Sequence, residues 1–202
     1  GTSTINRVAG KVSDAINFDG ADDYVAVGDK DIYDFNATAS FSYGAWIKST
    51  AFQAPIGDRV ISKRNGTDSG QVGYDFSILT TDGIFAELSD GTTEKRIVSN
   101  ITALNQWFFV MVVVDRFTNQ MELYVDGIKR SSVGLVGFGS LVNSNSLEFS
   151  RVSGVNGNNY KGLIDDVRIY NRALSSDEIK RLYESGVFNR FFSVENVNRS
   201  GD

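Results

Sequence analysis

The chain has 202 residues, of which 20 are glycine and one is proline, with no cysteine, no histidine and a formal net charge of −5. Without cysteine or histidine it cannot build a disulfide framework, a Cys- or His-ligated zinc site or a Ser-His-Asp triad. The acidic balance, with no block of basic residues, makes nucleic acid and anionic membranes poor partners. No apolar run approaches the roughly 18 residues of a membrane span, so membrane insertion is not expected.

Hydrophobic periodicity predicts about a dozen short strands joined by tight turns, which is typical of an all-β chain. The run Trp107–Val114 is apolar throughout and suits a strand covered on both faces. The pair Asp126-Gly127 supplies the residues of a type I′ hairpin turn. Strands are expected at Ala15–Phe18, Tyr24–Val27, Ser40–Lys48, Val60–Lys63, Tyr74–Leu79, Gly83–Leu88, Glu94–Val98, Trp107–Val114, Met121–Val125, Ile128–Val133, Leu147–Val152 and Leu163–Tyr170.

One short helix is expected near the C-terminal end, over Asp177–Glu184. Ser175 is placed to cap it, and Glu178 three residues later completes a capping box. Gly186 stands where a left-handed residue often ends a helix. No linker interrupts the pattern, so residues 1–188 are expected to form a single domain, followed by a tail, residues 189–202, that frays.

The strand before this helix contains two adjacent carboxylates, Asp165 and Asp166, inside an otherwise apolar run. A charge at a half-buried strand position is costly unless something pairs with it. The two residues therefore indicate either a site or the edge of one.

These segments, in this order, resemble the LamG-like jelly roll of the concanavalin A-like lectin/glucanase superfamily. The resemblance is carried by NFDGADDYVAV, SFSYGAWIK, QWFFVMVVVD, MELYVDGI and GLIDDVRIYNRALSSDEI, and it covers roughly Val12 to Glu184. It implies an antiparallel two-sheet β-sandwich with one short C-terminal helix. It also implies a glycan- or glycoprotein-binding module of a secreted or surface protein. Because the N-terminus has no apolar signal core, an exported form is expected to be a mature or excised segment.

A structural calcium ion is also expected. In a jelly roll the first and last strands are commonly neighbours, which would bring Asp19 and Asp23 to Asp165 and Asp166, and calcium takes several carboxylate, carbonyl and water oxygens. The resemblance points to the same residues, through its FDG..DY turn and its IDD segment. The alternative is that Asp19 and Asp22 are turn formers, while Asp165 pairs with Arg168 or accepts backbone N–H bonds.

Loop residues are the expected ligand contacts: Arg64, Tyr74, Asn156, Asn159 and Tyr160. Aromatic rings pack on sugar faces, and a few converging polar groups fix the orientation of a ligand. The alternative for each is a loop-anchoring aromatic or a solvated polar residue. Trp46 and Trp107 lie in strongly apolar strands and are expected in the core.

No catalytic residues are expected. Glycoside hydrolysis by the usual route needs two carboxylates held across the scissile bond, and the superfamily's E-x-D-x-x-E or E-x-D-x-E motif is missing. The sequence therefore indicates a non-catalytic extracellular carbohydrate-binding module whose partner is a polysaccharide or a glycoprotein glycan. The alternatives are a protein–protein adhesion domain and, third, a polysaccharide hydrolase or lyase.

Overall fold

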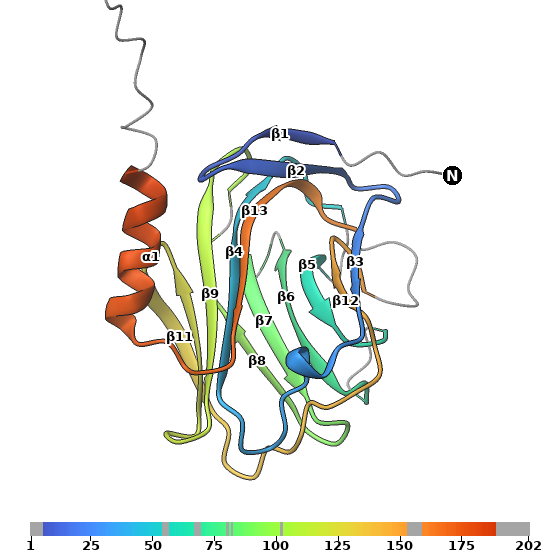
Figure 1. Ribbon diagram of the computed structural model, residues 1–202, viewed down its shortest axis with the longest axis vertical. Helices are drawn as coiled ribbons and strands as arrows, with labels where there is room; N and C mark the ends of the chain where they lie inside the picture. The colour runs from blue at the N-terminus through green and yellow to red at the C-terminus, as the bar shows by residue number, and fades with distance from the viewer. Residues whose placement is uncertain are drawn as a thin grey trace, which may run out of the picture.

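The computed structural model describes residues 6–53, 57–66, 70–79, 81, 83–101, 103–152 and 159–188, and its strands form two stacked antiparallel sheets (Figure 1). The strand order is β1-β2-β13-β4-β9-β10-β11 in the seven-stranded sheet and β3-β12-β5-β6-β7-β8 in the six-stranded sheet. This arrangement confirms the predicted all-β sandwich.

The elements have the following bounds. The seven-stranded sheet contains β1 (Arg7–Ala9), β2 (Asp14–Asp19), β13 (Lys161–Tyr170), β4 (Phe41–Ser49), β9 (Phe108–Asp115), β10 (Gln120–Val125) and β11 (Ile128–Gly134). The six-stranded sheet contains β3 (Val25–Gly28), β12 (Leu147–Phe149), β5 (Asp58–Lys63), β6 (Gly73–Leu79), β7 (Gly83–Ser89) and β8 (Glu94–Val98). A single-turn helix η1 (Asp31–Tyr33) precedes β4, and α1 (Ser176–Phe188) follows β13.

All twelve expected strands are present, and two differences have local causes. The expected strand Leu147–Val152 ends at Phe149, because Ser150 adopts a left-handed backbone angle, φ 76°, that leaves the β region. Strand β1 was not predicted, because three residues are too few to show a period; it forms by pairing Val8 with Ala15 on β2.

The first and last long strands are neighbours, as expected. Strand β2 pairs with β13 so that Asp19 lies opposite Lys161 and Ile16 opposite Ile164. On its other edge β13 pairs with β4. Segments from the first and last parts of the described chain thus pair as the second and third strands of one sheet, which makes the fold dependent on contacts of very long sequence separation.

The main core lies between the two sheets. Alternate residues of β4 and β9, such as Tyr43 and Val112, face alternate residues of β6 and β7, such as Phe76 and Ala86, and all four are fully buried. Side chains one position away on each strand point outward, as the two-residue period of a strand requires.

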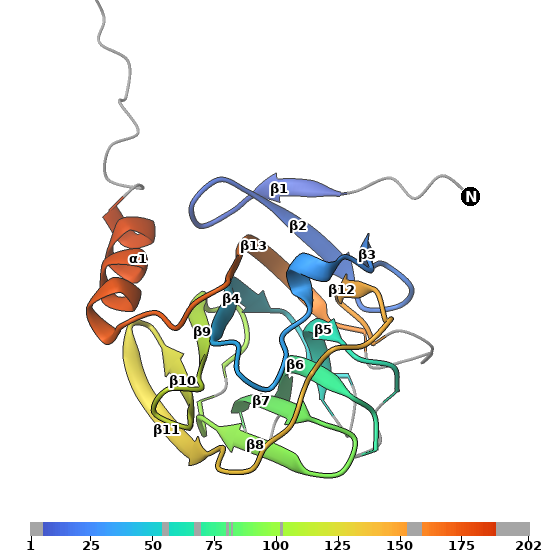
Figure 2. The same cartoon turned by 60° about the horizontal axis from the view of Figure 1, so that its bottom comes forward.

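The outer face of the seven-stranded sheet is covered by α1 (Figure 2). Trp46 and Phe109 form a second apolar cluster there with Ile179 of the helix. Trp46 is buried as expected, but in this outer cluster. Within the described residues, none of the helices has the length and apolar character needed to cross a membrane.

The helix begins where the sequence predicts and ends later. The Ser175 N–H donates to Glu178 Oε2 at 2.9 Å and the Glu178 N–H donates to Ser175 Oγ at 3.3 Å, which confirms the capping box. The prediction that Gly186 ends the helix is wrong. Gly186 lies inside α1. A Cβ at this position would stand 2.6 Å from Trp46 Nε1, so the missing side chain allows the helix to approach the sheet.

Candidate functional site

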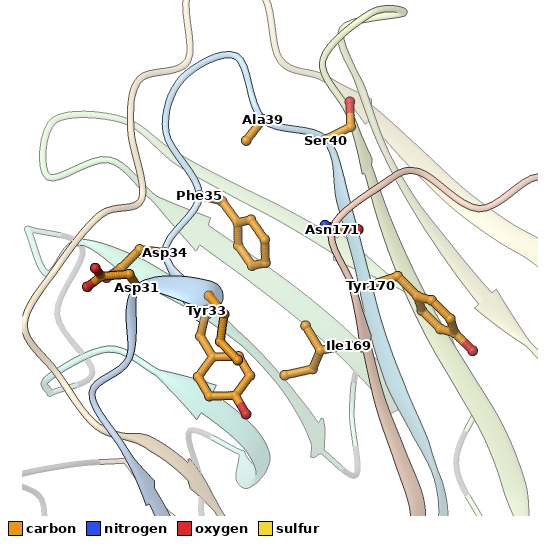
Figure 3. Close-up of a pocket in the computed structure, with 10 residues that line it drawn as sticks. Asp31, Tyr33, Asp34, Phe35, Ala39, Ser40, Ile169, Tyr170 and Asn171 are labelled. Carbon is orange, nitrogen blue, oxygen red and sulfur yellow. The ribbon is translucent and has the colours of Figure 1, made fainter.

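A pocket of about 480 Å³ opens at the end of the sandwich where η1, the start of β4 and the end of β13 meet. Its volume lies within the range of small-molecule sites in proteins. Figure 2 turns this end toward the viewer, and Figure 3 shows the pocket itself. The lining residues are Asp31, Ile32, Tyr33, Asp34, Phe35, Ala39, Ser40, Ile169, Tyr170 and Asn171.

The floor of the pocket is aromatic and rigid. The ring of Phe35, which is 3% exposed, stacks on Phe41 with centroids 3.9 Å apart and lies 5.8 Å from the ring of Tyr74. The Tyr74 hydroxyl donates to the carbonyl of Tyr33 at 3.1 Å. Burial raises the pKa of Tyr74, and the nearby Asp34 charge adds to the shift, so this hydroxyl keeps its proton.

A buried lysine holds the acidic side of the pocket in place. Lys63 Nζ donates to Asp34 Oδ1 at 2.8 Å, to Asp29 Oδ1 at 3.0 Å and to the Asn143 carbonyl at 2.9 Å, and its side chain is 0% exposed. The Asn143 N–H also donates to Asp34 Oδ1. A buried ammonium needs such partners, so Lys63 ties η1 to the loop that follows β11.

The pocket has an apolar middle and polar sides. In Figure 3 the side chains of Tyr33, Phe35 and Ile169 lie near one another, with Asp31 and Asp34 on one side and Ser40 and Asn171 on the other. The ring of Tyr170 points away from Phe35, and its hydroxyl lies 3.2 Å from Arg168 Nη1. Tyr33 and Ile169 are half-buried, so part of each remains open to solvent.

Exposed apolar side chains surround this end of the molecule. Ile32 is 68% exposed in η1, Phe117 94% in the β9–β10 turn, and Val136 and Val142 are 84% and 52% exposed after β11. The three segments are neighbours because β4 pairs with β9 and β10 pairs with β11.

The acidic turn at the other end of β3 brings together part of the predicted metal set. Carboxylate oxygens of Asp19, Asp22 and Asp23 lie within 4.8 Å of one another, and these residues are exposed or half-buried. The turn is held by amide donors from elsewhere: Gln53 Nε2 to the Gly20 carbonyl and Asn159 Nδ2 to the Ala21 carbonyl, each at 2.7 Å. Three converging carboxylates are a donor set that suits calcium.

The other two predicted metal ligands do not join this turn. Asp165 Oδ2 accepts the N–H groups of Lys11, Val12 and Ser13 at 2.7, 2.8 and 3.2 Å, so it fastens the β1–β2 turn to β13. Asp166 has a left-handed φ of 50° at a bulge in β13 and accepts from Arg168 Nε at 2.8 Å. The structure therefore uses Asp165 as an acceptor of backbone N–H bonds, the alternative that the sequence left open.

A charged cluster lies on the outer face of the six-stranded sheet. Asp75 on β6 and Glu87 on β7 are cross-strand partners; Arg64 Nη1 lies 3.3 Å from Asp75 Oδ2 and 3.4 Å from Glu87 Oε2, and Arg59 Nη1 lies 3.7 Å from both acids. Burial, followed by the charge of Asp75, raises the pKa of Glu87 to about 7, although both arginines act in the opposite direction. Asp75 and Arg64 are 0% exposed and Glu87 is 9% exposed, so the charged cluster is largely buried.

The predicted ligand contacts are largely inside the molecule. Arg64, Tyr74 and Tyr160 are 0% exposed and Asn159 is 5% exposed, so their placement on open loops is wrong. Tyr74 supports the pocket from beneath, and the hydroxyl of Tyr160 accepts a hydrogen bond from Ser49 Oγ. Asn156 lies outside the described residues, as does the predicted tail 189–202.

Sequence reasoning missed the pocket because most of its lining residues lie in connections without periodicity, outside the predicted strands. The signal was the segment Asp31–Phe35, DIYDF, in which two aromatic residues and two acids stand between strands. Loop aromatics flanked by polar groups are candidates for binding, but only the packing of Phe35 on Phe41 shows that this loop folds inward.

The two stacked antiparallel sheets, in which the first long strand β2 pairs with the last strand β13, form a jelly-roll β-sandwich. Loops at one end of this sandwich form the pocket. A family model described as the concanavalin A-like lectin/glucanases superfamily matches residues 19–180, more than half of the chain. The chain belongs to this superfamily.

Known proteins share the fold at low sequence identity. The chain is 23% identical over 195 residues to the non-toxic nonhemagglutinin type A of Clostridium botulinum (strain Kyoto / Type A2), covering 96% of this chain and 16% of that protein. It thus spans about a sixth of the length of the curated relatives it matches. The binding domain of Paraclostridial Mosquitocidal Protein 1 superposes with a TM-score of 0.73 at 20% identity, covering 90% of this chain and 45% of that one.

Two structural neighbours were solved with sugars. Domain 4 of AbnA, a GH43 extracellular arabinanase from Geobacillus stearothermophilus, was solved with arabinotriose; it superposes with a TM-score of 0.66 at 16% identity, covering 90% of this chain and 82% of that one. The CBM40 of the Ruminococcus gnavus IT-sialidase was solved with α2,3 sialyllactose; its TM-score is 0.69 at 16% identity, covering 84% of this chain and 96% of that one. At these identities the likeness establishes the fold alone.

Proposed function

We propose that this chain is a non-catalytic glycan-binding module of a larger secreted or surface protein, and that the pocket between η1 and β13 is its binding site. The observation that carries the proposal is the composition of that pocket, an apolar middle of Tyr33, Phe35 and Ile169 between polar side chains. A sugar ring has an apolar C–H face and a polar edge of hydroxyls, and so matches such a surface on both counts.

The comparisons support a binding role. Two neighbours of the same fold carry sugars, and the toxin neighbour is itself a binding domain. The short span of this chain on its curated relatives supports a module within a larger protein. The arabinanase whose domain 4 shares the fold is an extracellular enzyme, which supports the same setting for this chain.

A non-catalytic role is supported by the burial and ion pairing of Asp75 and Glu87, the carboxylate pair in which Glu87 has a raised pKa. A raised pKa beside a second acid is typical of a glycosidase acid. In this chain the pair is Glu87 and Asp75, and both are ion-paired with Arg59 and Arg64 beneath the surface. A reducing-sugar assay on a polysaccharide panel checks this point, and any release of sugar by the chain would contradict a non-catalytic role. Release that persists in Glu87→Gln would mean that the activity lies at a site other than this carboxylate pair.

The direct test is glycan binding by the chain and by a matched pair of tyrosine variants. Tyr33→Ala removes the half-buried ring of the pocket and is expected to weaken binding at least tenfold. Tyr24→Ala removes a 43% exposed ring at the opposite end of β3 and is expected to leave binding unchanged. Equal loss in both variants, or no retention on any glycan, contradicts the proposal.

A second candidate is a protein-docking domain, which is favoured by the exposed apolar side chains of this end, Ile32, Phe117, Val136 and Val142. Exposed apolar surface of this kind marks contact sites for other proteins. The double variant Phe117→Ser/Val136→Ser separates the two functions, because it removes apolar area outside the pocket lining. Loss of a protein partner with retained glycan binding would favour docking.

We also propose a structural calcium ion at the acidic turn, held by Asp19, Asp22 and Asp23. An ion bound only by the folded chain raises the free energy of unfolding, by about 2.7 kcal/mol at a free concentration 100 times Kd. Added calcium is therefore expected to raise Tm, and EDTA to lower it. In Asp22→Asn both effects should shrink, while Asp177→Asn on α1 should behave as the parent. A melting curve that ignores calcium contradicts this site.

A further inference from the structure

The charge distribution around the pocket narrows the class of glycan that it can accept, and this step rests on the function proposed above. Of the ten lining residues the two that carry a charge are both carboxylates, Asp31 and Asp34. Asp29 stands beside them through its bond to Lys63. Within the part of the chain that the structure describes, three carboxylates therefore lie here with the buried ammonium of Lys63 and the exposed Lys30 beside them.

That ammonium is not available to a ligand. Lys63 is 0% exposed, and its three short hydrogen bonds to Asp29, Asp34 and the Asn143 carbonyl use its three N–H donors. It pairs with Asp34 from beneath, whereas Asp31 is an exposed residue of the pocket lining.

The arginines of neighbouring elements are also engaged. Arg168 donates to Asp166, and Arg172 makes two bonds to Glu178 at 2.9 and 2.7 Å. On the other side Arg116 donates to the carbonyls of Phe138 and Gly139. The exposed Lys30 precedes η1 directly and is not among the lining residues. It is the cation most able to weaken the field of Asp31.

We infer that the pocket selects neutral oligosaccharides over anionic ones such as sialylated, uronate-containing or sulfated glycans. A neutral sugar places its C–H face on Tyr33 and Ile169 and donates its hydroxyls to the acidic side. An anionic glycan brings a like charge to Asp31 and finds no basic side chain among the lining residues, which costs binding energy and discriminates against it. The selection is electrostatic and therefore depends on ionic strength.

The test is binding of the whole chain to paired neutral and acidic probes. The neutral set is mannan, galactan, β-glucan and lactose. The acidic set is the same three polysaccharides after oxidation of their primary hydroxyls to carboxylates, with α2,3-sialyllactose for lactose. At about 0.01 M ionic strength the tightest neutral probe is expected to bind roughly tenfold more tightly than its acidic counterpart, and the ratio should fall toward one near 1 M.

Three variants assign the effect to this pocket. Asp31→Asn should lower the neutral-to-acidic ratio by roughly threefold, and Lys30→Gln should raise it. Glu184→Gln removes a charge from α1, away from the pocket, and should leave the ratio unchanged. These substitutions change exposed side chains, so folding is expected to be retained.

The outcomes distinguish the selection of neutral glycans from glycan binding itself. Acidic probes that bind as tightly as neutral ones, or more tightly, overturn the selection while leaving glycan binding intact. A ratio that is the same in Asp31→Asn and in the parent also overturns it. Binding to no probe of either set overturns the glycan-binding function, and the selection with it.

Discussion

The outer faces of the two sheets are both buried, but their chemistry is opposite. On the seven-stranded sheet, Trp46 and Phe109 pack beneath Ile179 of α1, an apolar contact between a sheet and a helix. On the six-stranded sheet, the outward positions carry Asp75 and Glu87, which are neutralised by arginines of β5 and of the residues that follow it. An apolar face tolerates gradual repacking, whereas a buried charge depends on every one of its partners.

The largest expected effect is on the charged face. Asp75→Ala removes an acidic partner of both Arg59 and Arg64, which then keep Glu87 and, for Arg64, Glu94; breaking a buried ion pair from one side typically costs about 3–5 kcal/mol. Denaturant unfolding measures the loss. Asp177→Ala, at the exposed start of α1, is the matched control and should change stability by under about 1 kcal/mol. Equal losses in the two variants would mean that the cluster is not coupled to folding.

The next effect concerns Asp165, a carboxylate that the seven-stranded sheet buries opposite Trp46. Asp165→Ala removes the acceptor of three backbone N–H bonds, and the groups left without a partner cost on the order of 2–3 kcal/mol. Asp165→Asn keeps one carbonyl oxygen and should lose about half as much. Hydrogen exchange at Val12 and Ser13 provides the local measurement, since both N–H groups should exchange faster in Asp165→Ala than in the parent.

The charged face should also make stability depend on pH. Glu87 has a pKa of about 7 in the folded chain, above the usual value of 4.5, so the folded state keeps a proton that the unfolded state releases between these values. Its contribution is therefore full below about pH 4.5 and is lost as the pH rises through 7, a change on the order of 3 kcal/mol. Glu87→Gln should flatten the curve of unfolding free energy between these pH values, while Asp177→Asn should not.

The smallest effect is expected where the helix meets the apolar face. Gly186→Ala gains about 1 kcal/mol of helix propensity but puts a Cβ within 2.6 Å of Trp46 Nε1, an overpacking that typically costs about 1–3 kcal/mol. A net loss of about 1 kcal/mol is expected by thermal unfolding. Ser185→Ala, on the exposed side of α1, should be neutral or slightly stabilising. A stabilised Gly186→Ala would show that α1 can move away from Trp46.

Sequence reasoning located the strands well because a strand buries every second residue, and that period is visible locally. It also placed the capping box of α1, since Ser175 and Glu178 act on neighbouring backbone groups. It failed at Gly186, where the deciding contact is Trp46, a residue far away in the sequence. It failed in the same way at Tyr74, which lies in a correctly predicted strand but points inward beneath Phe35.

The sequence by itself determined the class of fold, the positions of the strands along the chain and the exclusion of cysteine and histidine chemistry. Only the tertiary structure decided which acids meet. Asp165 accepts hydrogen bonds from the β1–β2 turn. Asp19 and Asp23 lie close to each other and to Asp22, and Asp34 pairs with the buried Lys63. The pocket between η1 and β13 likewise depends on long-range contacts, such as the stacking of Phe35 on Phe41 and the bond of Lys63 to Asp34. The physical reason is that periodicity records which side of an element is buried, whereas a site depends on pairings between distant segments that no local pattern contains.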